Sequence, residues 1–256
     1  MPRVVFSPSG AIGLSMFFTL WKDLPKVDDP SDVNCLLSIP NFPNCLVLPW
    51  YQVPQLYRMF KEGDPDWEFQ KNGSLDNIAS WGIVLNTSTC LEQVYIDHIK
   101  KQVGHDREKH VAGDYGEISK GFEDRVVGRG YIIKGWAPQV SILRHLVVGT
   151  FLTHYGWNST LEGIPTGVTM LTWPMGAEQF LNAKLFVEQL RVGIRVGKGS
   201  QNIPESAMLA SLLAEAVNGS RPERLQAKEL YDAVLGAVVK GGSFDKHLNE
   251  FVDSLY

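Results

Sequence analysis

Short apolar runs alternate with helical periodicity along the second half of the chain. Apolar runs typical of buried strands are followed by segments in which apolar residues recur every three to four positions, joined by short polar connections. The runs predict strands at 130–134, 147–152 and 168–172, and the periodic segments predict helices at 140–144, 158–164, 178–190, 204–217, 222–239 and 243–255. Strands and helices in alternation favour parallel sheets flanked by helices, the α/β class with doubly wound, Rossmann-type domains.

The first hundred residues are less regular. Apolar runs predict buried strands at 4–6 and 81–85, and periodicity predicts helices at 11–20, 55–60, 67–79 and 91–101. Between them, Pro43 and Pro49 favour an extended region, because proline keeps the preceding residue out of the helical conformation. A charged, glycine-containing stretch follows. The predicted organisation is a first domain over 1–106, a junction over 107–128 and a second domain over 129–256.

Composition excludes several classes of function. The chain of 256 residues has a net charge of −4 and scattered Lys and Arg residues, so a nucleic-acid partner is not expected. Its cysteines, Cys35, Cys45 and Cys90, are odd in number and have no zinc-type spacing. Pro8 and Gly10 interrupt the first apolar run, and no segment is long enough for a membrane span. We therefore predict a cytoplasmic monomer without a membrane partner.

Candidate chemistry follows the predicted strands, where ligands of open α/β sheets bind. Trp136 follows the first of these strands and offers a flat face for stacking a nucleotide base. Gly156 after the second strand permits a close backbone approach, and the helix that Asn158 and Ser159 open can bind phosphate through its free N–H groups. Taken singly, Trp136 would be interpreted as a core residue. The Asn-Ser pair would be interpreted as a plain helix cap, a role that is compatible with phosphate binding.

The loop after the third strand carries Glu178 and Gln179. A carboxylate beside an amide can hydrogen-bond adjacent sugar hydroxyls and so discriminate between sugars. As single residues, both would be interpreted as solvated groups that cap a helix.

The segment 136–179, WAPQVSILRHLVVGTFLTHYGWNSTLEGIPTGVTMLTWPMGAEQ, with its HxGWNSxxEG core, resembles the signature of plant secondary-product glycosyltransferases. These UDP-sugar-dependent family 1 enzymes have the two-domain GT-B fold. The resemblance implies a UDP-sugar site in which uracil, ribose, diphosphate and sugar are each contacted by part of the signature. By this resemblance, Trp136 and Ala137 contact uracil, and Gln139 and Glu162 contact the ribose. The diphosphate is contacted by His154, Gly156, Asn158 and Ser159, and the sugar by Trp157, Glu178 and Gln179.

Two features of the signature bear on the donor. Gln179 at the end of the signature favours glucose as the donor sugar, by resemblance to the family. Tyr155 replaces a residue that is commonly small in the family, which predicts extra bulk beside the phosphates. No cofactor and no metal are expected besides the UDP-sugar itself. Asp64-Pro65-Asp66 imitates a metal-binding DxD motif, but an aspartate and a proline at the start of a helix explain it better.

Within the first domain, PSGAIGLS and EGDPDWEF resemble the branch of the family that acts on flavonoid-type phenolics. The family's catalytic histidine and its aspartate partner have no match in this chain, so we expect a chain truncated at the N-terminus and deleted internally. The resemblance implies transfer of a sugar, glucose in the leading interpretation, to a phenolic hydroxyl. The alternatives are a non-catalytic UDP-sugar-binding fragment and an interaction protein whose exposed sheet edges pair with a longer relative.

Overall fold

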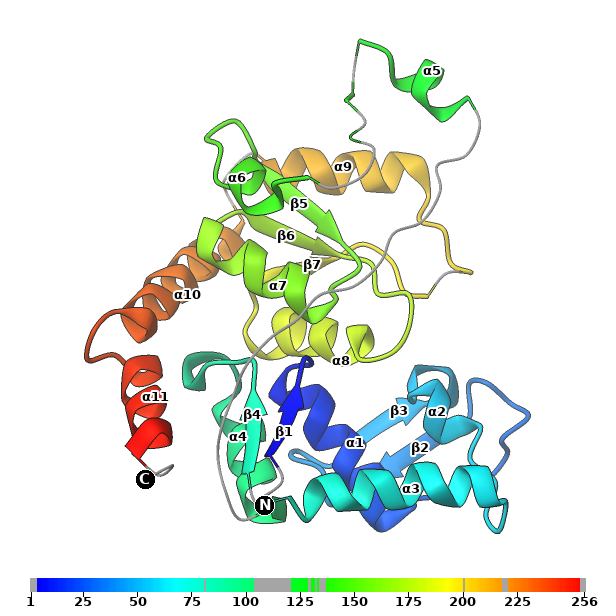
Figure 1. Cartoon of the computed structure of the whole chain (residues 1–256). Helices are drawn as coiled ribbons and strands as arrows, with labels where there is room; N and C mark the ends of the chain where they lie inside the picture. Colours follow the sequence, from blue (N-terminus) through cyan, green and yellow to red (C-terminus); the bar gives the residue numbers. More distant parts are fainter. Residues whose placement is uncertain are drawn as a thin grey trace.

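The protein comprises two groups of elements, one below the other in Figure 1. A computed structural model describes residues 4–80, 82–103, 121–128, 130–131, 133, 137–199, 201–217 and 221–253. The lower group comes from the first hundred residues and the upper group from residues beyond 137. Most of the predicted junction 107–128 lies outside the described residues, so the proposed domain limits stay a prediction.

The lower group is built on a parallel pair of strands, β1 (Val4–Ser7) and β4 (Gly82–Leu85), with Val4 opposite Gly82. Helices α1 (Ala11–Asp23), α3 (Pro65–Ile78) and α4 (Thr89–Val103) pack beside this pair. An antiparallel hairpin, β2 (Leu36–Ile39) and β3 (Leu46–Pro49), leads into the short helices η1 (Trp50–Gln52) and α2 (Gln55–Arg58). Residues of α1 form the centre of this core, with Trp21 stacked edge-on against Tyr57 and Phe60.

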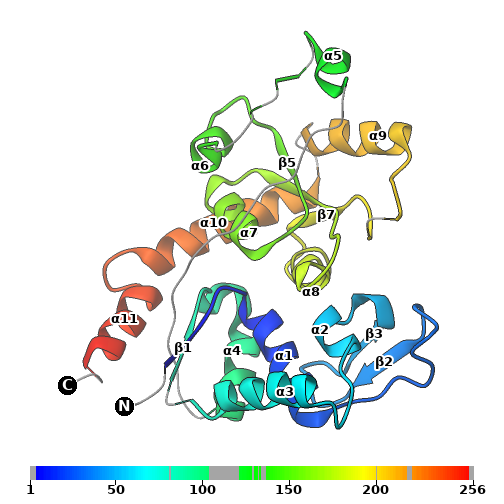
Figure 2. The same cartoon turned by 45° about the vertical axis from the view of Figure 1, so that its right-hand side comes forward.

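The upper group is built on a parallel sheet in the order β5 (Thr150–Thr153), β6 (Thr169–Thr172), β7 (Gly193–Arg195). Figure 2 shows α6 (Gln139–Leu143), α7 (Trp157–Gly163) and α9 (Ser206–Val217) around this sheet. The short helix η2 (Ile164–Thr166) continues α7, and α8 (Gln179–Lys184) continues into a π-helical turn, η3 (Leu185–Gln189). The small helix α5 (Phe122–Val126) stands apart from the rest.

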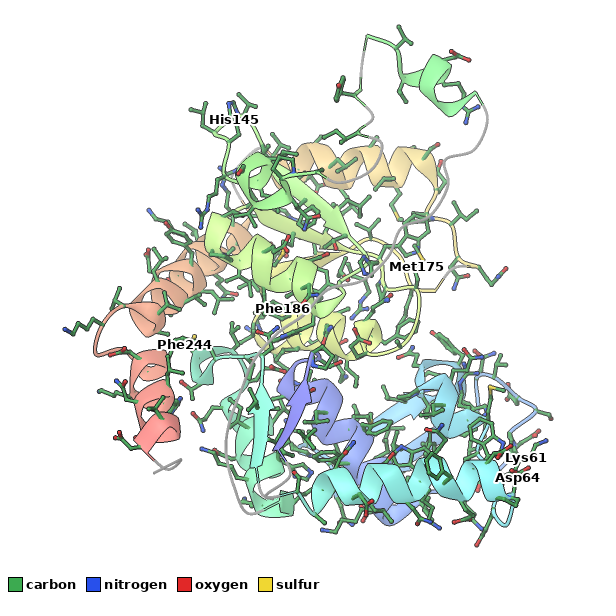
Figure 3. The ribbon with its side chains drawn as sticks, viewed as in Figure 1. Lys61, Asp64, His145, Met175, Phe186 and Phe244 are labelled. Carbon is green, nitrogen blue, oxygen red and sulfur yellow. The ribbon has the colours of Figure 1, made fainter. Side chains whose placement is uncertain are left out.

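Helix α8 lies between the sheet of the upper group and helix α1 of the lower group (Figures 1 and 3). Phe186, fully buried, lies in this layer. The rings of Tyr51 and Phe180 meet edge-on with centroids 5.7 Å apart. Helix α10 (Pro222–Val238) runs down from the upper group to contact α4, and α11 (Ser243–Asp253) follows it. The two groups are thus joined by packing as well as by the chain.

The predicted elements are confirmed along most of the described chain. The strands at 4–6, 81–85, 147–152 and 168–172 and all the predicted helices are present with shifted ends. The strand predicted at 130–134 is wrong for Gly130, Tyr131 and Ile133, which are not in a strand; Tyr131 is 91% exposed, unlike a side chain of a buried strand. The remaining two residues of that range lie outside the described residues.

Asp64 confirms the helix-capping interpretation of its motif. Its carboxylate accepts hydrogen bonds from the N–H groups of Asp66 and Trp67, at 3.1 and 3.4 Å, and Pro65 occupies the first turn of α3. Figure 3 shows Asp64 at the far edge of the lower group, away from Met175. Among the described residues there is no cluster of three or more His, Cys, Asp or Glu able to hold a metal, and no helix long and apolar enough to cross a membrane.

Candidate functional site

Most of the residues predicted to bind a UDP-sugar lie in the loops after β5 and β6 and at the starts of α7 and α8, whereas Gln139 begins α6 and Glu162 lies near the end of α7. Trp136, predicted to stack on uracil, lies outside the described residues. Ala137 is half-buried before α6, and the side chain of Gln139 donates to a Glu162 carboxylate oxygen at 2.7 Å. The predicted ribose-binding pair is therefore brought together, by the contact of α6 with α7.

His154 directly follows β5 and is exposed. Its ring lies over Gly156: a Cβ placed on Gly156 would be 2.5 Å from Nε2 of His154. The glycine therefore serves to admit the imidazole rather than to permit an unusual backbone angle, since its φ of −59° is open to any residue. The imidazole and the start of α7 consequently share one small region of surface.

Tyr155 does not add bulk to this region, contrary to the prediction from the sequence. A φ of +66° turns its side chain into the core, where it is fully buried with its ring 5.6 Å from that of Phe186. The Asn182 side chain donates to the Tyr155 carbonyl at 2.9 Å and holds this turn. The apolar environment offsets the backbone strain, because a large aromatic side chain is removed from water. Burial also raises the pKa of Tyr155.

The start of α7 presents one buried and two polar side chains. Trp157 is 2% exposed and donates its indole N–H to the Asn86 carbonyl of the lower group, so it can reach a ligand only through its backbone. Asn158 and Ser159 are half-buried, and Oδ1 of Asn158 is enclosed without a hydrogen-bond partner. A buried amide oxygen left unpaired is costly, which is common at functional sites.

The loop between β6 and α8 is a closed turn held by Gln179. Its side-chain oxygen accepts from the N–H groups of Met175 and Gly176, at 2.9 and 3.1 Å. Ala177 has a φ of +51°, an uncommon conformation for a residue with a side chain. Glu178 follows it, half-buried, and among the described residues nothing pairs with its carboxylate. Of the predicted sugar-binding pair, Gln179 shapes the loop and Glu178 is left available.

Both halves of the signature meet the first turn of α1. A Cβ on Gly10 would lie 2.9 Å from the Trp157 ring, and a Cβ on Gly13 would lie 3.3 Å from Cβ of Glu178. Gly10 and Gly13 are three residues apart, one helical turn, so they lie on the same face of the chain. The start of α1 is therefore the point at which the lower group contacts both the α7 start and the loop that carries Glu178.

A cavity of about 480 Å³ opens at this point. It lies between the β1–α1 segment, the loop that precedes α2, and the start of α8. Its lining residues are Val5, Ser7, Pro8, Ser9, Gly13, Leu14, Phe17, Pro54, Gln55, Leu56, Asn77, Ala177, Glu178 and Leu181. Aliphatic and aromatic walls with a few hydroxyl, amide and carboxylate groups are typical of a small-molecule site.

Glu92 supports this site and was missed by sequence reasoning. Its two carboxylate oxygens accept from the N–H groups of Ala11 and Ile12, at 2.8 and 2.7 Å, although the side chain is only 1% exposed. Burial raises the pKa of Glu92 to about 7 despite these hydrogen bonds. Because its partners lie 80 residues earlier in the chain, no local pattern could have indicated this role.

Comparisons with known proteins identify relatives of the chain. The family model for UDP-glucuronosyl and UDP-glucosyl transferases matches residues 120–212. Flavonol 3-O-glucosyltransferase of Arabidopsis thaliana is 36% identical over 326 aligned residues, covering 98% of this chain and 69% of that protein. UDP-glycosyltransferase 89B2 of Stevia rebaudiana is 38% identical, covering 99% and 70%. The first alignment is longer than the chain itself, so part of that relative has no counterpart here.

Solved structures extend the likeness to the fold. The crystal structure of Arabidopsis thaliana UGT89C1 has a TM-score of 0.72 at 25% identity and covers 99% of this chain and 66% of that one. The same protein complexed with UDP has a TM-score of 0.63 at 29% identity, covering 75% and 62%. Together with the relatives aligned along nearly the whole sequence, these likenesses show that the chain belongs to the plant family 1 UDP-glycosyltransferases, sugar-transferring enzymes of the GT-B fold class.

Proposed function

We propose that this chain transfers glucose from UDP-glucose to a hydroxyl of a small phenolic acceptor of the flavonoid type. The observation that carries the proposal is the position of the cavity. It joins apolar walls from the lower group, such as Leu14 and Phe17, to Glu178 of the donor signature. A flat phenolic molecule fits such walls, and a sugar hydroxyl fits the carboxylate.

The donor part of the proposal rests on the α7 start. His154, Asn158 and Ser159 would hold the diphosphate, Glu162 and Gln139 the ribose, and Glu178 and Gln179 the sugar. His154 is exposed beside the start of α7, where polar groups can offset the charge that develops on the departing UDP. This arrangement calls for no metal and no further cofactor. A monomeric state and a cytoplasmic location stay predictions from the sequence.

The acceptor part draws on the relatives. The Arabidopsis relative is by name a flavonol 3-O-glucosyltransferase, and the segment PSGAIGLS, which supplies Ser9 and Gly13 to the cavity, carries the flavonoid-branch resemblance. Phe17 and Leu56 would contact the aromatic rings from opposite segments of the wall.

A transfer assay tests the proposal. The chain is incubated with UDP-glucose and a flavonol, and the glucoside is detected by mass spectrometry; the controls omit UDP-glucose, the flavonol or the protein. We expect a hexose adduct that requires both substrates. A chain that UDP stabilises but that forms no glucoside would instead be a UDP-sugar-binding fragment. This second candidate has an observation in its favour, because no histidine is among the described residues that line the cavity.

A further inference from the structure

One continuous segment of the lower group forms a large part of the cavity wall. Half of the lining residues lie between Val5 and Phe17, from strand β1 through the first turns of α1. The start of α8, which carries Glu178 of the donor signature, lines the same cavity. The position of the first turn of α1 therefore sets how a molecule in the cavity lies relative to the donor signature.

The first turn of α1 has no cap of its own. A helix begins with N–H groups that have no partner within the helix, and Gly10 at the N-cap has no side chain to accept from them. The carboxylate oxygens of Glu92 accept instead from Ala11 and Ile12, at 2.8 and 2.7 Å. Helix α4 departs from helical geometry at Glu92 itself, with φ −138° and ψ 29°. A residue of α4 thus fixes the place where α1 begins.

The segment that leads into Glu92 also holds the donor signature. The carbonyl of Asn86, directly after β4, accepts the indole N–H of Trp157, the first residue of α7. The Trp157 ring and Oε2 of Glu92 both lie 2.9 Å from the position that a Cβ of Gly10 would occupy, so the ring, the carboxylate and the glycine pack together. Residues 86–92 therefore contact the start of α1 on the acceptor side and the start of α7 on the donor side.

We propose that Glu92 is a positioning residue for the transfer reaction, acting through the first turn of α1. This inference rests on the proposed function. Glu92 is buried and is not one of the lining residues, so its effect on an acceptor passes through α1. A wall displaced by about 1 Å weakens acceptor binding and slows transfer, because the reaction needs close alignment of the two substrates.

Calorimetric titration with the flavonol quercetin tests this role in Glu92→Gln. The amide can accept from one of the two N–H groups but presents its own N–H groups to the other, so the start of α1 is held less well. We expect the Kd for quercetin to rise about tenfold, the equivalent of one hydrogen bond, at unchanged stoichiometry. The Kd for UDP should change less than about twofold, because Trp157 keeps its bond to Asn86. In the transfer assay, KM for the flavonol should rise while KM for UDP-glucose does not.

Gly10→Ala disturbs the same contact without changing a lining residue. The added Cβ would meet Oε2 of Glu92 and displace the carboxylate. We expect a similar rise in the Kd for quercetin. In the double variant with Glu92→Gln, the total loss of affinity should be smaller than the product of the two single losses, because both changes break one contact.

Glu68→Gln is the matched control. The carboxylate of Glu68 on α3 also accepts from a backbone N–H, that of Gly63 at 3.2 Å, and Glu68 does not line the cavity. We expect this variant to bind quercetin and UDP with the affinities of the unmutated chain.

Several results would overturn the inference. An unchanged Kd for quercetin in Glu92→Gln would show that α1 keeps its place without the carboxylate. A lower stoichiometry at unchanged Kd, or equal losses of quercetin and UDP affinity, would mean that Glu92 only stabilises the fold. An unmutated chain that binds UDP but not quercetin would have no acceptor site to position. If Glu92→Gln transfers glucose as the unmutated chain does, the inference fails and the proposed function stands; if the unmutated chain neither responds to UDP nor forms a glucoside, the proposed function itself fails.

Discussion

Two carboxylates flank the first turn of α1, and their environments are opposite. Glu92, from the lower group, is almost fully buried, and both oxygens accept backbone N–H groups. Glu178, from the upper group, is half-buried and unpartnered among the described residues. A buried carboxylate with its hydrogen bonds satisfied fixes backbone, whereas an available one at the edge of a cavity can serve a ligand.

The same contrast holds for other polar groups. In the lower group, Thr19, His98 and Gln102 bond to one another between α1 and α4. In the upper group, Oδ1 of Asn158 is enclosed without a partner among the described residues, and His154, four residues earlier, is exposed. These polar side chains of the lower group thus form hydrogen bonds that stabilise the fold. Several polar side chains of the signature have no such partner among the described residues, as expected of a site that binds a substrate.

The largest expected effect concerns the pH dependence of stability through Glu92. Burial raises its pKa from the ordinary value of 4.5 to about 7, so the folded chain holds this proton to higher pH than the unfolded chain does. The free energy of unfolding should therefore fall as pH rises from about 4.5 through 7, by on the order of 3 kcal/mol. Tyr95, an ionisable group that also interacts with Glu92, stays neutral in this range because burial raises its pKa.

Glu92→Gln removes this titration. Chemical denaturation of both proteins between pH 4 and 8 gives the difference in unfolding free energy, which should decline with pH and level off above about 7. If the difference in unfolding free energy between the two proteins were constant over this pH range, Glu92 would not have a raised pKa in the folded chain. The proposed difference between the environments of Glu92 and Glu178 would then be wrong.

A smaller effect is expected at Gly156. In Gly156→Ala the added Cβ would meet the His154 ring, which must move away from the α7 start. We expect UDP affinity measured by calorimetry to fall about tenfold, equivalent to roughly 1.4 kcal/mol, with little change in stability. Gly73→Ala in α3, where a Cβ would meet nothing within 4 Å, is the control and should leave affinity unchanged. Equal UDP affinities of the unmutated chain, Gly156→Ala and Gly73→Ala would show that His154 does not contribute to UDP binding.

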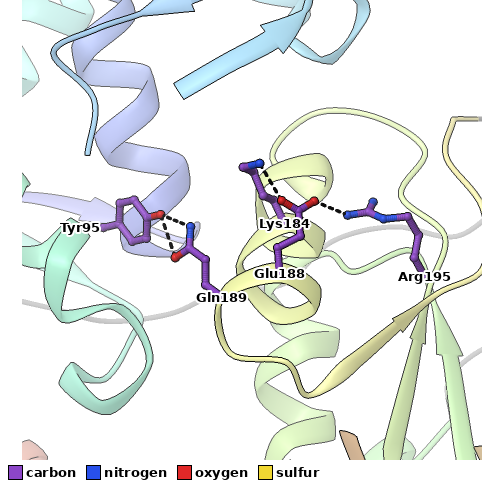
Figure 4. A network of polar contacts seen from close by, with 5 residues as sticks. All are labelled: Tyr95, Lys184, Glu188, Gln189 and Arg195. Carbon is purple, nitrogen blue, oxygen red and sulfur yellow. Dashed lines mark hydrogen bonds and ion pairs between the residues drawn. The ribbon is translucent and has the colours of Figure 1, made fainter. Parts of the chain in front are cut away.

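The smallest effect concerns the link between the two groups. The hydroxyl of Tyr95 on α4 contacts the Gln189 side chain in η3 at 2.7 and 3.1 Å (Figure 4). Gln189 is exposed, so water can replace the lost partner, and Tyr95→Phe should lower the free energy of unfolding by about 1 kcal/mol. UDP affinity should not change. A loss of affinity as large as that of Gly156→Ala would mean that this link positions the donor site.

The sequence predicted the donor side of the molecule better than the acceptor side. The apolar runs and helical periodicity around β5, α7, β6 and α8 are local, and so is the signature that they carry. The hairpin β2–β3 was predicted only as an extended region, and β7, with three residues, was not predicted as a strand. These strands are fixed by their partners rather than by their own pattern.

Long-range contacts account for the remaining misses. The cap that Glu92 forms on α1, the close approach of Gly13 to Glu178 and the buried position of Trp157 each join residues more than seventy positions apart. The inward turn of Tyr155 depends on its positive φ and on Asn182. The sequence places Tyr155, Trp157 and Glu178 in the signature, but only the packed structure shows which of these side chains stay available to a ligand.

Thermal unfolding with increasing UDP tests the central claim that the signature forms a donor site. At one hundred times the dissociation constant, UDP should stabilise the unmutated chain by about 2.7 kcal/mol, a clear rise in Tm. In the double variant His154→Ala, Asn158→Ala this rise should largely disappear, while the Tm without UDP stays close to that of the unmutated chain. An unmutated chain whose Tm does not respond to UDP, or a double variant that responds equally, would contradict the account.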